Sequence, residues 1–542
     1  MTPDRVAVTA VVAAMNVDAA LLHVTTAALM GLILSAGIER FLQPRPLLKR
    51  PLAAWQAHAG LWFACYGSIA LVTGRPWCAL AATAALLMTL ALVSNAKMRS
   101  LREPFIFQDY DYFLDAVRFP RLFLPFFGVK SFLGATAVFM LALACLYYES
   151  PPIHRFAWNG QLGGLAVVLG AAALLLRSAS RQGFSVHFRP EDDLRALGLP
   201  ACIWAYARAE RAAPDLRSPF DSAGIWISKP QPAPHLVAVQ LESFFDARAF
   251  YDGIKTDVLA EFDAIKAESA YGALTVPAWG ANTVRTEFAF LTGVGEDSLG
   301  AHRFNPYRVV ARGRHVSSLP MFLKGMGYRV ICIHPYWAQY YSRDRVFRRF
   351  GFDEFMDIRS FTGARRFGPY VADAEVGEKI VQALRKAACP TFVFAITMEN
   401  HGPLHLERAR LSDVEELYTT PPPPGCDDLT IYLRHLRNTD RMLGSLRVAF
   451  MDQDLPVELC CFGDHVPVMP KTYSILGAPD GNAPCLWWSN PQRRDGLQLE
   501  HASLDSSDAW RGQAGRCGVE SPLPVHLMAP AWLRSIQARA DR

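Results

Sequence analysis

Several features that would place this chain in a familiar class of protein are missing. Its eleven cysteines include no C-x-x-C pair, so a structural zinc site is not expected. Lysine and arginine form no basic block and the formal net charge is only +5, which disfavours a nucleic-acid partner. The chain has no internal repeat. The amino-terminal apolar stretch lacks a small-residue cleavage site, so it is not expected to be a cleaved signal peptide.

Apolar residues are abundant (51%) but unevenly spread, and long charge-free runs occupy the first 180 residues. A helix needs about 20 apolar residues to cross the hydrocarbon core of a membrane. We therefore predict about five spans, with four as the alternative count. The five stretches are 17–38, 54–74, 77–96, 131–149 and 161–177.

This pattern predicts a membrane-anchored protein with four parts. They are a transmembrane domain (1–180), a juxtamembrane connector (181–230), a globular head (231–490) and a polar carboxyl-terminal tail (491–542). Basic residues follow the first and third predicted spans, between 40 and 50 and between 97 and 102. The positive-inside rule places both loops in the cytoplasm, and with five spans it would place the head there too.

Four apolar runs after residue 230 are predicted to be strands, and helical stretches such as 317–326 and 373–388 separate them. Alternating strands and helices predict an α/β head with a mostly parallel sheet. The four predicted strands are 236–241, 329–333, 391–397 and 456–462. Cys460 and Cys461 are adjacent in the last one, and we expect them to be core thiols on opposite faces of the sheet.

Acids and histidines follow these four strands. Glu242 comes directly after the first, Asp464 and His465 after the last, and His334 and His401 after the other two. Each of them alone is more simply read as a solvated or structural side chain. Because ligands collect at the carboxyl ends of the strands in open α/β sheets, Glu242 with Asp464 and His465 predicts a metal site. The two further histidines at strand ends argue against a chance pattern.

Thr283 lies in a stretch rich in Gly, Asn and Thr just before a predicted helix at 286–292. A hydroxyl at a helix start lies near backbone N–H donors that attract phosphate, and a nearby cation would make it a nucleophile. An ordinary helix cap explains the same spacing. Arg343 follows His334 by nine residues and is suited to bind a phosphate, although an exposed ion pair is the commoner finding.

Taken together, these segments resemble the lipoteichoic acid synthase and phosphoglycerol transferase family, membrane enzymes with a sulfatase-like or alkaline-phosphatase-like head. The matching stretches run in order from about residue 95 to 470. They include Gln-Leu-Glu-Ser-Phe at 240–244, Asn-Thr-Val-Arg-Thr-Glu-Phe at 282–288, His-Pro-Tyr at 334–336, Arg-Asp at 343–344, Asn-His-Gly-Pro at 400–403 and Gly-Asp-His at 463–465.

The resemblance implies that Glu242, Thr283, Asp464 and His465 hold one divalent metal ion, Mn²⁺ or Mg²⁺. It implies that Thr283 attacks the phosphorus of a phospholipid head group, with phosphatidylglycerol or phosphatidylethanolamine as donor. Diacylglycerol would leave, and a glycan acceptor would then take the phosphoglycerol or phosphoethanolamine unit from a phospho-threonine intermediate.

The same resemblance gives His401 the roles of binding the transferred phosphate and moving a proton, with Arg343 and His334 in supporting positions. It also implies a multi-pass protein of the plasma membrane whose head faces outward, which conflicts with the positive-inside expectation for five spans.

Two departures bear on the activity. The sulfatase motif of Cys or Ser followed by x-Pro-x-Arg is absent, because residues 275–279 read Thr-Val-Pro-Ala-Trp, and sulfate-ester hydrolysis is therefore disfavoured. Arg285 also introduces a cation close to Thr283. Three alternatives remain: a phosphoethanolamine transferase, a phosphodiesterase-like hydrolase that uses water as acceptor, and an inactive scaffold.

Overall fold

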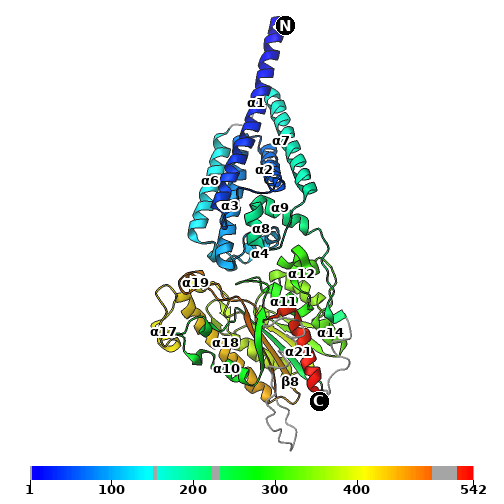
Figure 1. The fold of residues 1–542 in the computed structure, drawn as a ribbon, viewed down its shortest axis with the longest axis vertical. Helices are drawn as coiled ribbons and strands as arrows, with labels where there is room; N and C mark the ends of the chain where they lie inside the picture. The colour runs from blue at the N-terminus through cyan, green and yellow to red at the C-terminus, as the bar shows by residue number, and fades with distance from the viewer. Residues whose placement is uncertain (1–2, 150–154, 222–231, 491–521, 541–542) are drawn as a thin grey trace, which may run out of the picture. The chain divides into compact units, whose positions relative to one another are not determined.

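The computed structural model describes residues 3–149, 155–221, 232–490 and 522–540. It divides the chain into two compact units, Met1–Ala213 and Pro214–Arg542 (Figure 1). The described part of the first unit is helical, and that of the second is built on a large sheet.

Five long helices of the first unit coincide with the five predicted spans. They are α1 (Pro3–Ile38), α2 (Leu52–Thr73), α3 (Pro76–Leu101), α6 (Val129–Tyr148) and α7 (Arg155–Gln182). Four helical segments among the described residues are long and apolar enough to cross a membrane: Ala20–Phe41, Pro76–Leu101, Ser131–Tyr148 and Asn159–Gln182. By this criterion α2 falls short, and the number of crossings stays a prediction.

The helix α2 packs against α1 through polar as well as apolar groups. Trp62 donates its indole N–H to the carbonyl of Ala28 at 3.1 Å, and the Tyr66 hydroxyl donates to the carbonyl of Val24 at 2.9 Å. Buried polar side chains need such partners. They also lower the hydropathy of α2 relative to the other long helices.

A buried charge cluster joins the end of α1 to two helices of the predicted connector, α8 (Pro190–Leu197) and α9 (Leu199–Ala209). The fully buried Glu39 accepts hydrogen bonds from Arg50 at 2.6 Å and from the backbone N–H of Leu199 at 2.7 Å. His58 of α2 lies 3.3 Å from the same carboxylate. Gly198 has a positive φ of 80°, and a Cβ there would collide with Arg50. The helices α8 and α9 are thus held to the other helices of the first unit by hydrogen bonds to a buried ion pair.

We expect Glu39→Ala to destabilise the first unit by about 3–5 kcal/mol, because it leaves the buried Arg50 without a counter-charge. Glu191→Ala is the matched control, since Glu191 pairs with Arg195 on the surface at 2.6 Å and such pairs contribute about 0–1 kcal/mol. Thermal unfolding of the detergent-solubilised chain measures both. Equal shifts in the two variants would contradict the assignment of Glu39 as a buried anchor.

The head contains an eight-stranded sheet with the order β10-β2-β9-β8-β1-β7-β3-β4 among the described residues. The four predicted strands are confirmed as β1 (His235–Leu241), β3 (Arg329–Ile333), β7 (Thr391–Ile396) and β8 (Val457–Gly463). Four others are not predicted: β2 (Ala270–Thr275), β4 (Glu354–Met356), β9 (Ala483–Ser489) and β10 (Leu523–Pro524). The strand β9 runs antiparallel to both neighbours, so the sheet is mixed.

Both faces of the sheet are buried by helices. Leu236 and Ala238 of β1 pack on the face covered by α11 (Thr283–Thr292), whereas Val237 and Val239 pack on the opposite face. That opposite face is covered by α16 (Asp373–Arg385) and α18 (Asp427–Met451) (Figure 1). Cys460 and Cys461 are buried on opposite faces, as predicted.

The described end of the chain is part of the head and not an appendage. Residues 491–521 of the predicted tail lie outside the described residues, but β10 pairs with β2, and α21 (Val525–Ala540) packs against α11. Trp532 and Leu533 of α21 are fully buried. The apolar face of α21, which follows a polar stretch of the sequence, therefore completes the core of the head.

Candidate active site

The carboxyl ends of β1, β7 and β8 form one edge of the sheet, because these three neighbouring strands are parallel. Glu242 follows β1, and Asp464 and His465 follow β8. One potential ligand atom from each of the three residues lies within 4.8 Å of the others, and all three residues are buried. They form the one such group among the described residues.

The donor atoms of this group suit a divalent cation. His465 donates from Nδ1 to the carbonyl of Val466 at 3.1 Å, which leaves Nε2 as a lone-pair donor. That Nε2 and Oδ2 of Asp464 are both buried without a hydrogen-bond partner among the described residues. Nε2 lies 3.4 Å from Oδ2 of Asp464 and 3.7 Å from Oε1 of Glu242. A cation between them would satisfy all three.

Ser243 fixes the two carboxylates. Its backbone N–H donates to Asp464 at 2.8 Å, and its hydroxyl donates to Glu242 at 2.8 Å. Burial and the nearby Asp464 charge raise the pKa of Glu242 to about 8. Burial also raises the pKa of Asp464. Two adjacent buried carboxylates are unfavourable without a cation, so the cluster does not serve stability, and its donor atoms suit a metal ion.

Thr283 is the first helical residue of α11, and the preceding Asn282 occupies the cap position with a positive φ of 61°. The helix has no side-chain cap, so Thr283 does not serve as one. Its side chain instead interacts with the Asp464 carboxylate and counteracts the effect of burial on the pKa of Asp464. Thr286 also donates to the backbone carbonyl of Asp464 at 3.0 Å, which fastens the start of α11 to the end of β8.

Arg343 begins α15 (Arg343–Arg349) and is 2% exposed. It forms a two-point ion pair with the fully buried Glu287 of α11, in which the Nε to Oε2 distance is 3.0 Å. Arg285, the cation beside Thr283 in the sequence, stacks on the Phe304 ring at 4.9 Å and donates to the Phe304 carbonyl.

The two remaining predicted histidines lie at the same edge of the sheet. His334 donates from Nδ1 to the Ile396 carbonyl at 3.3 Å, and burial together with the Arg343 charge lowers its pKa well below the usual value. His401 donates from Nδ1 to the Gly402 carbonyl, and Nδ1 also lies 3.2 Å from the Tyr370 hydroxyl. Burial lowers the pKa of His401 as well, so both imidazoles are neutral near pH 7.

A second layer of buried polar groups supports the His401 loop. Asn400 donates to the backbone carbonyl of Glu242 at 3.1 Å. Glu399 accepts from His435 of α18 at 3.2 Å, and the other ring nitrogen of His435 lies 3.0 Å from Glu407. No local pattern in the sequence predicts a role for these residues, and Glu287 and Ser243 stand there only within longer motifs. Their partners are far apart in the chain, so spacing gives no signal for them.

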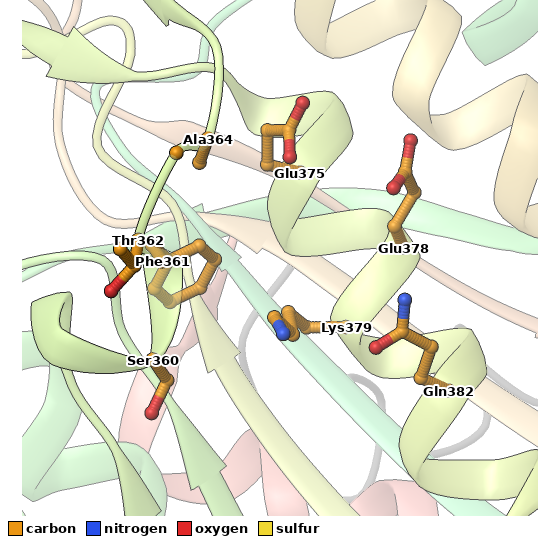
Figure 2. Close-up of a pocket in the computed structure, with 9 residues that line it drawn as sticks. Ser360, Phe361, Thr362, Ala364, Glu375, Glu378, Lys379 and Gln382 are labelled. Atoms are coloured by element: carbon orange, nitrogen blue, oxygen red, sulfur yellow. The ribbon is translucent and has the colours of Figure 1, made fainter.

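A cavity of about 180 Å³ lies between residues 360–364 and α16 (Figure 2). Glu375, Glu378, Lys379 and Gln382 line its helical side. None of the candidate site residues lines it, and Arg365 pairs with Glu375 at 2.9 Å. It is a polar surface hollow separate from the candidate site.

Comparison with known proteins assigns the family. The sulfatase family model matches residues 234–510, about half of the sequence, and the chain belongs to the sulfatase family. This confirms the expected kinship with sulfatase-like membrane enzymes. Over 423 residues the chain is 26% identical to the capsular polysaccharide biosynthesis protein RkpI of Rhizobium meliloti (strain 1021). That match covers 73% of this chain and 75% of RkpI.

A second protein of the same organism carries the name of a cyclic β-1,2-glucan modification protein. It is 26% identical to this chain over 261 residues. That match covers 47% of this chain and 40% of the relative. Among solved structures, the lipooligosaccharide phosphoethanolamine transferase EptA from Neisseria meningitidis aligns with a TM-score of 0.56 and 14% identity. The alignment covers 97% of this chain and 95% of EptA. The fold, apolar amino-terminal helices followed by a sulfatase-type head, is thus confirmed.

We expect Asp464→Asn to raise the stability of the metal-free chain while abolishing its stabilisation by Mn²⁺. The substitution removes repulsion between buried carboxylates but also removes a ligand. In the wild type, Mn²⁺ at 100 times its dissociation constant should add about 2.7 kcal/mol. Thermal unfolding with Mn²⁺ or with EDTA measures both effects. The exposed Asp257→Asn is the control, and an unchanged Mn²⁺ response in Asp464→Asn would contradict the predicted metal site.

Because His435 lies between the carboxylates of Glu399 and Glu407, we expect the head to lose stability at alkaline pH. Burial lowers the pKa of His435, but its hydrogen bonds to the Glu399 and Glu407 carboxylates outweigh burial and raise the pKa to about 9. Because the unfolded value is about 6.5, the stabilisation is complete below that pH and disappears as the pH rises through 9. Its size is on the order of 3 kcal/mol.

Pulse proteolysis in urea at pH 6.5 and pH 9.5 tests this expectation. The wild-type head should lose stability between the two values, and His435→Gln should lose much less. His315→Gln, at an exposed position, should behave like the wild type. Parallel pH profiles for the wild type and His435→Gln would refute the assignment.

Proposed function

We propose that this protein is a membrane-bound, metal-dependent phosphotransferase. It moves a phosphoglycerol-type head group from a phospholipid to an extracytoplasmic glycan through a phospho-threonine intermediate on Thr283. Its head faces the outside of the plasma membrane. The observation that carries the proposal is the buried cluster of Glu242, Asp464 and His465 at the carboxyl edge of the sheet, with the Thr283 side chain interacting with Asp464.

Glu242, Asp464 and His465, together with the Thr283 oxygen, would hold the cation, Mn²⁺ or Mg²⁺. When bound, it supplies positive charge for the transferring phosphate and favours loss of the Thr283 proton. Arg343, which keeps one guanidinium nitrogen free of protein partners among the described residues, adds a second positive charge for the phosphate. Phosphoryl transfer depends on such positioning and charge neutralisation.

In the first step, the Thr283 oxygen forms a bond to phosphorus, and the bond between phosphorus and the diacylglycerol oxygen breaks. The Thr283 hydroxyl proton goes to that leaving oxygen, so diacylglycerol departs as a neutral alcohol. Thr283 stands at the start of α11, where the helix dipole favours negative charge on the phosphate.

In the second step, a sugar hydroxyl forms a bond to phosphorus, the bond to the Thr283 oxygen breaks, and the proton lost by the sugar restores the Thr283 hydroxyl. His401 is suited to take the sugar proton. Its Nδ1–H donates to the Gly402 carbonyl, so Nε2 is the basic atom. Its lowered pKa keeps the ring neutral and ready to accept a proton at pH 7.

The glycan acceptor is supported by RkpI, a capsular polysaccharide biosynthesis protein similar over 73% of this chain. Transfer of phosphoethanolamine is the second candidate, favoured by the shared fold with a phosphoethanolamine transferase over 97% of the chain. Sulfate-ester hydrolysis is disfavoured because the chain lacks the sulfatase motif, Cys or Ser followed by x-Pro-x-Arg. Residues 275–279 read Thr-Val-Pro-Ala-Trp, and the candidate nucleophile is Thr283.

Incubating the detergent-solubilised full chain with phosphatidylglycerol and Mn²⁺ should add the mass of one phosphoglycerol unit. Thr283→Ala should show no addition, because the attacking oxygen is gone. Intact-mass spectrometry measures the adduct. Thr256→Ala, which removes an exposed hydroxyl elsewhere in the head, should retain it.

Other outcomes separate the alternatives. An adduct formed only with phosphatidylethanolamine would favour the second candidate. Release of glycerol phosphate into water in the absence of a glycan would identify a hydrolase. A metal-loaded protein that forms no adduct and releases no product would overturn the proposal.

A further inference from the structure

Glu287 lies one helical turn after Thr283 on α11, so the two side chains point from the same side of the helix. It is fully buried in the interior of the head. Its carboxylate has two partners from elsewhere in the chain. Arg343 binds it through Nε and Nη2, and Tyr307 of α13 (Pro306–Ala311) donates its hydroxyl to Oε2 at 2.7 Å.

The ion pair uses one edge of the guanidinium and leaves the other nitrogen free. Nη1 of Arg343 is buried and finds no hydrogen-bond partner among the described residues. A buried cationic N–H group without a partner is costly and points to a ligand. Glu242, His334 and His401 are all within electrostatic range of this guanidinium, which connects it with the candidate site.

Stability alone does not explain this arrangement. A buried ion pair is often no more stable than apolar side chains of the same volume. Its distinctive effect is geometric, because two parallel hydrogen bonds fix the plane of a guanidinium that otherwise rotates freely. The rings of Tyr340 and Tyr341, 5.8 Å and 5.2 Å from its central carbon, restrict it further.

We propose that Glu287, held by Tyr307, is the positioning residue that directs Nη1 of Arg343 at the phosphate transferred to Thr283. This inference rests on the proposed function. The helix α11 then positions both the nucleophile Thr283 and, through Glu287, the Arg343 guanidinium that neutralises charge on the phosphate. Glu287 touches no reacting atom and acts through Arg343.

The test compares Glu287→Gln, Arg343→Gln and the double variant with the wild type in the full chain. Single-turnover formation of the Thr283 adduct from phosphatidylglycerol and Mn²⁺ is the readout. Glu287→Gln should slow adduct formation about 10- to 100-fold, as loss of an orienting partner typically does. The concentration of lipid that half-saturates the rate should change little, because the lost interaction belongs to the transition state.

The double variant decides whether Glu287 acts through Arg343. If it does, Glu287→Gln causes no further slowing once Arg343 is already Gln. Equal slowing in both backgrounds would mean that Glu287 only supports α11, and the inference would be overturned. The double variant also buries no unpaired charge, so it guards against loss of folding in the single variants.

Tyr307→Phe is a milder variant that keeps the ring and removes the hydroxyl bond to Glu287. It should slow adduct formation in the wild-type background and not in the Arg343→Gln background. Failure of the proposed function looks different, because the wild type itself would then form no adduct on Thr283. An active wild type with an unchanged rate in Glu287→Gln would overturn only this inference.

Discussion

The site depends on the parallel pairing of β1 with β7 on one side and β8 on the other. The register places Leu241 opposite Gly463 and Gln240 opposite Ile396, so the three strands stop at one level. Glu242, Asp464 and the 397–401 loop consequently emerge close together, although Glu242 and Thr397 are 155 residues apart and Ser243 and Asp464 are 221 residues apart. A shift of one residue in either pairing would turn the acids to the other face of the sheet.

Charge burial follows from this geometry. The ligand cluster places two carboxylates and an imidazole in the interior, and a second layer with Glu399, His435 and Glu407 lies behind the His401 loop. Asn400 connects the layers through the Glu242 carbonyl. Buried charge without water is unfavourable, so each group is held by hydrogen bonds or left ready for a ligand. The carboxyl ends of these strands are therefore preorganised to bind charged ligands, and their stability depends on pH.

Much of the fold could be predicted from sequence because its signals are local. Long apolar runs predicted the helices of the first unit, and four short, mostly apolar runs predicted the central strands. The strands β2 and β9 were missed because β2 is only partly buried and β9 contains Pro484 between small and aromatic residues. The buried stripe of α21 was missed for a similar reason, since it is short and follows a long polar stretch.

By itself the sequence determined a helical membrane-type region, an α/β head and the acids and histidines that follow its strands. Only the tertiary structure decided how these residues combine. It showed that Thr283 is not a helix cap, that Arg343 is bound by Glu287, and that His435 lies between two carboxylates. Glu287 and Arg343 are 56 residues apart, and Glu399 and His435 are 36 apart. No local preference encodes such pairs, because they form only when distant helices pack on the same sheet.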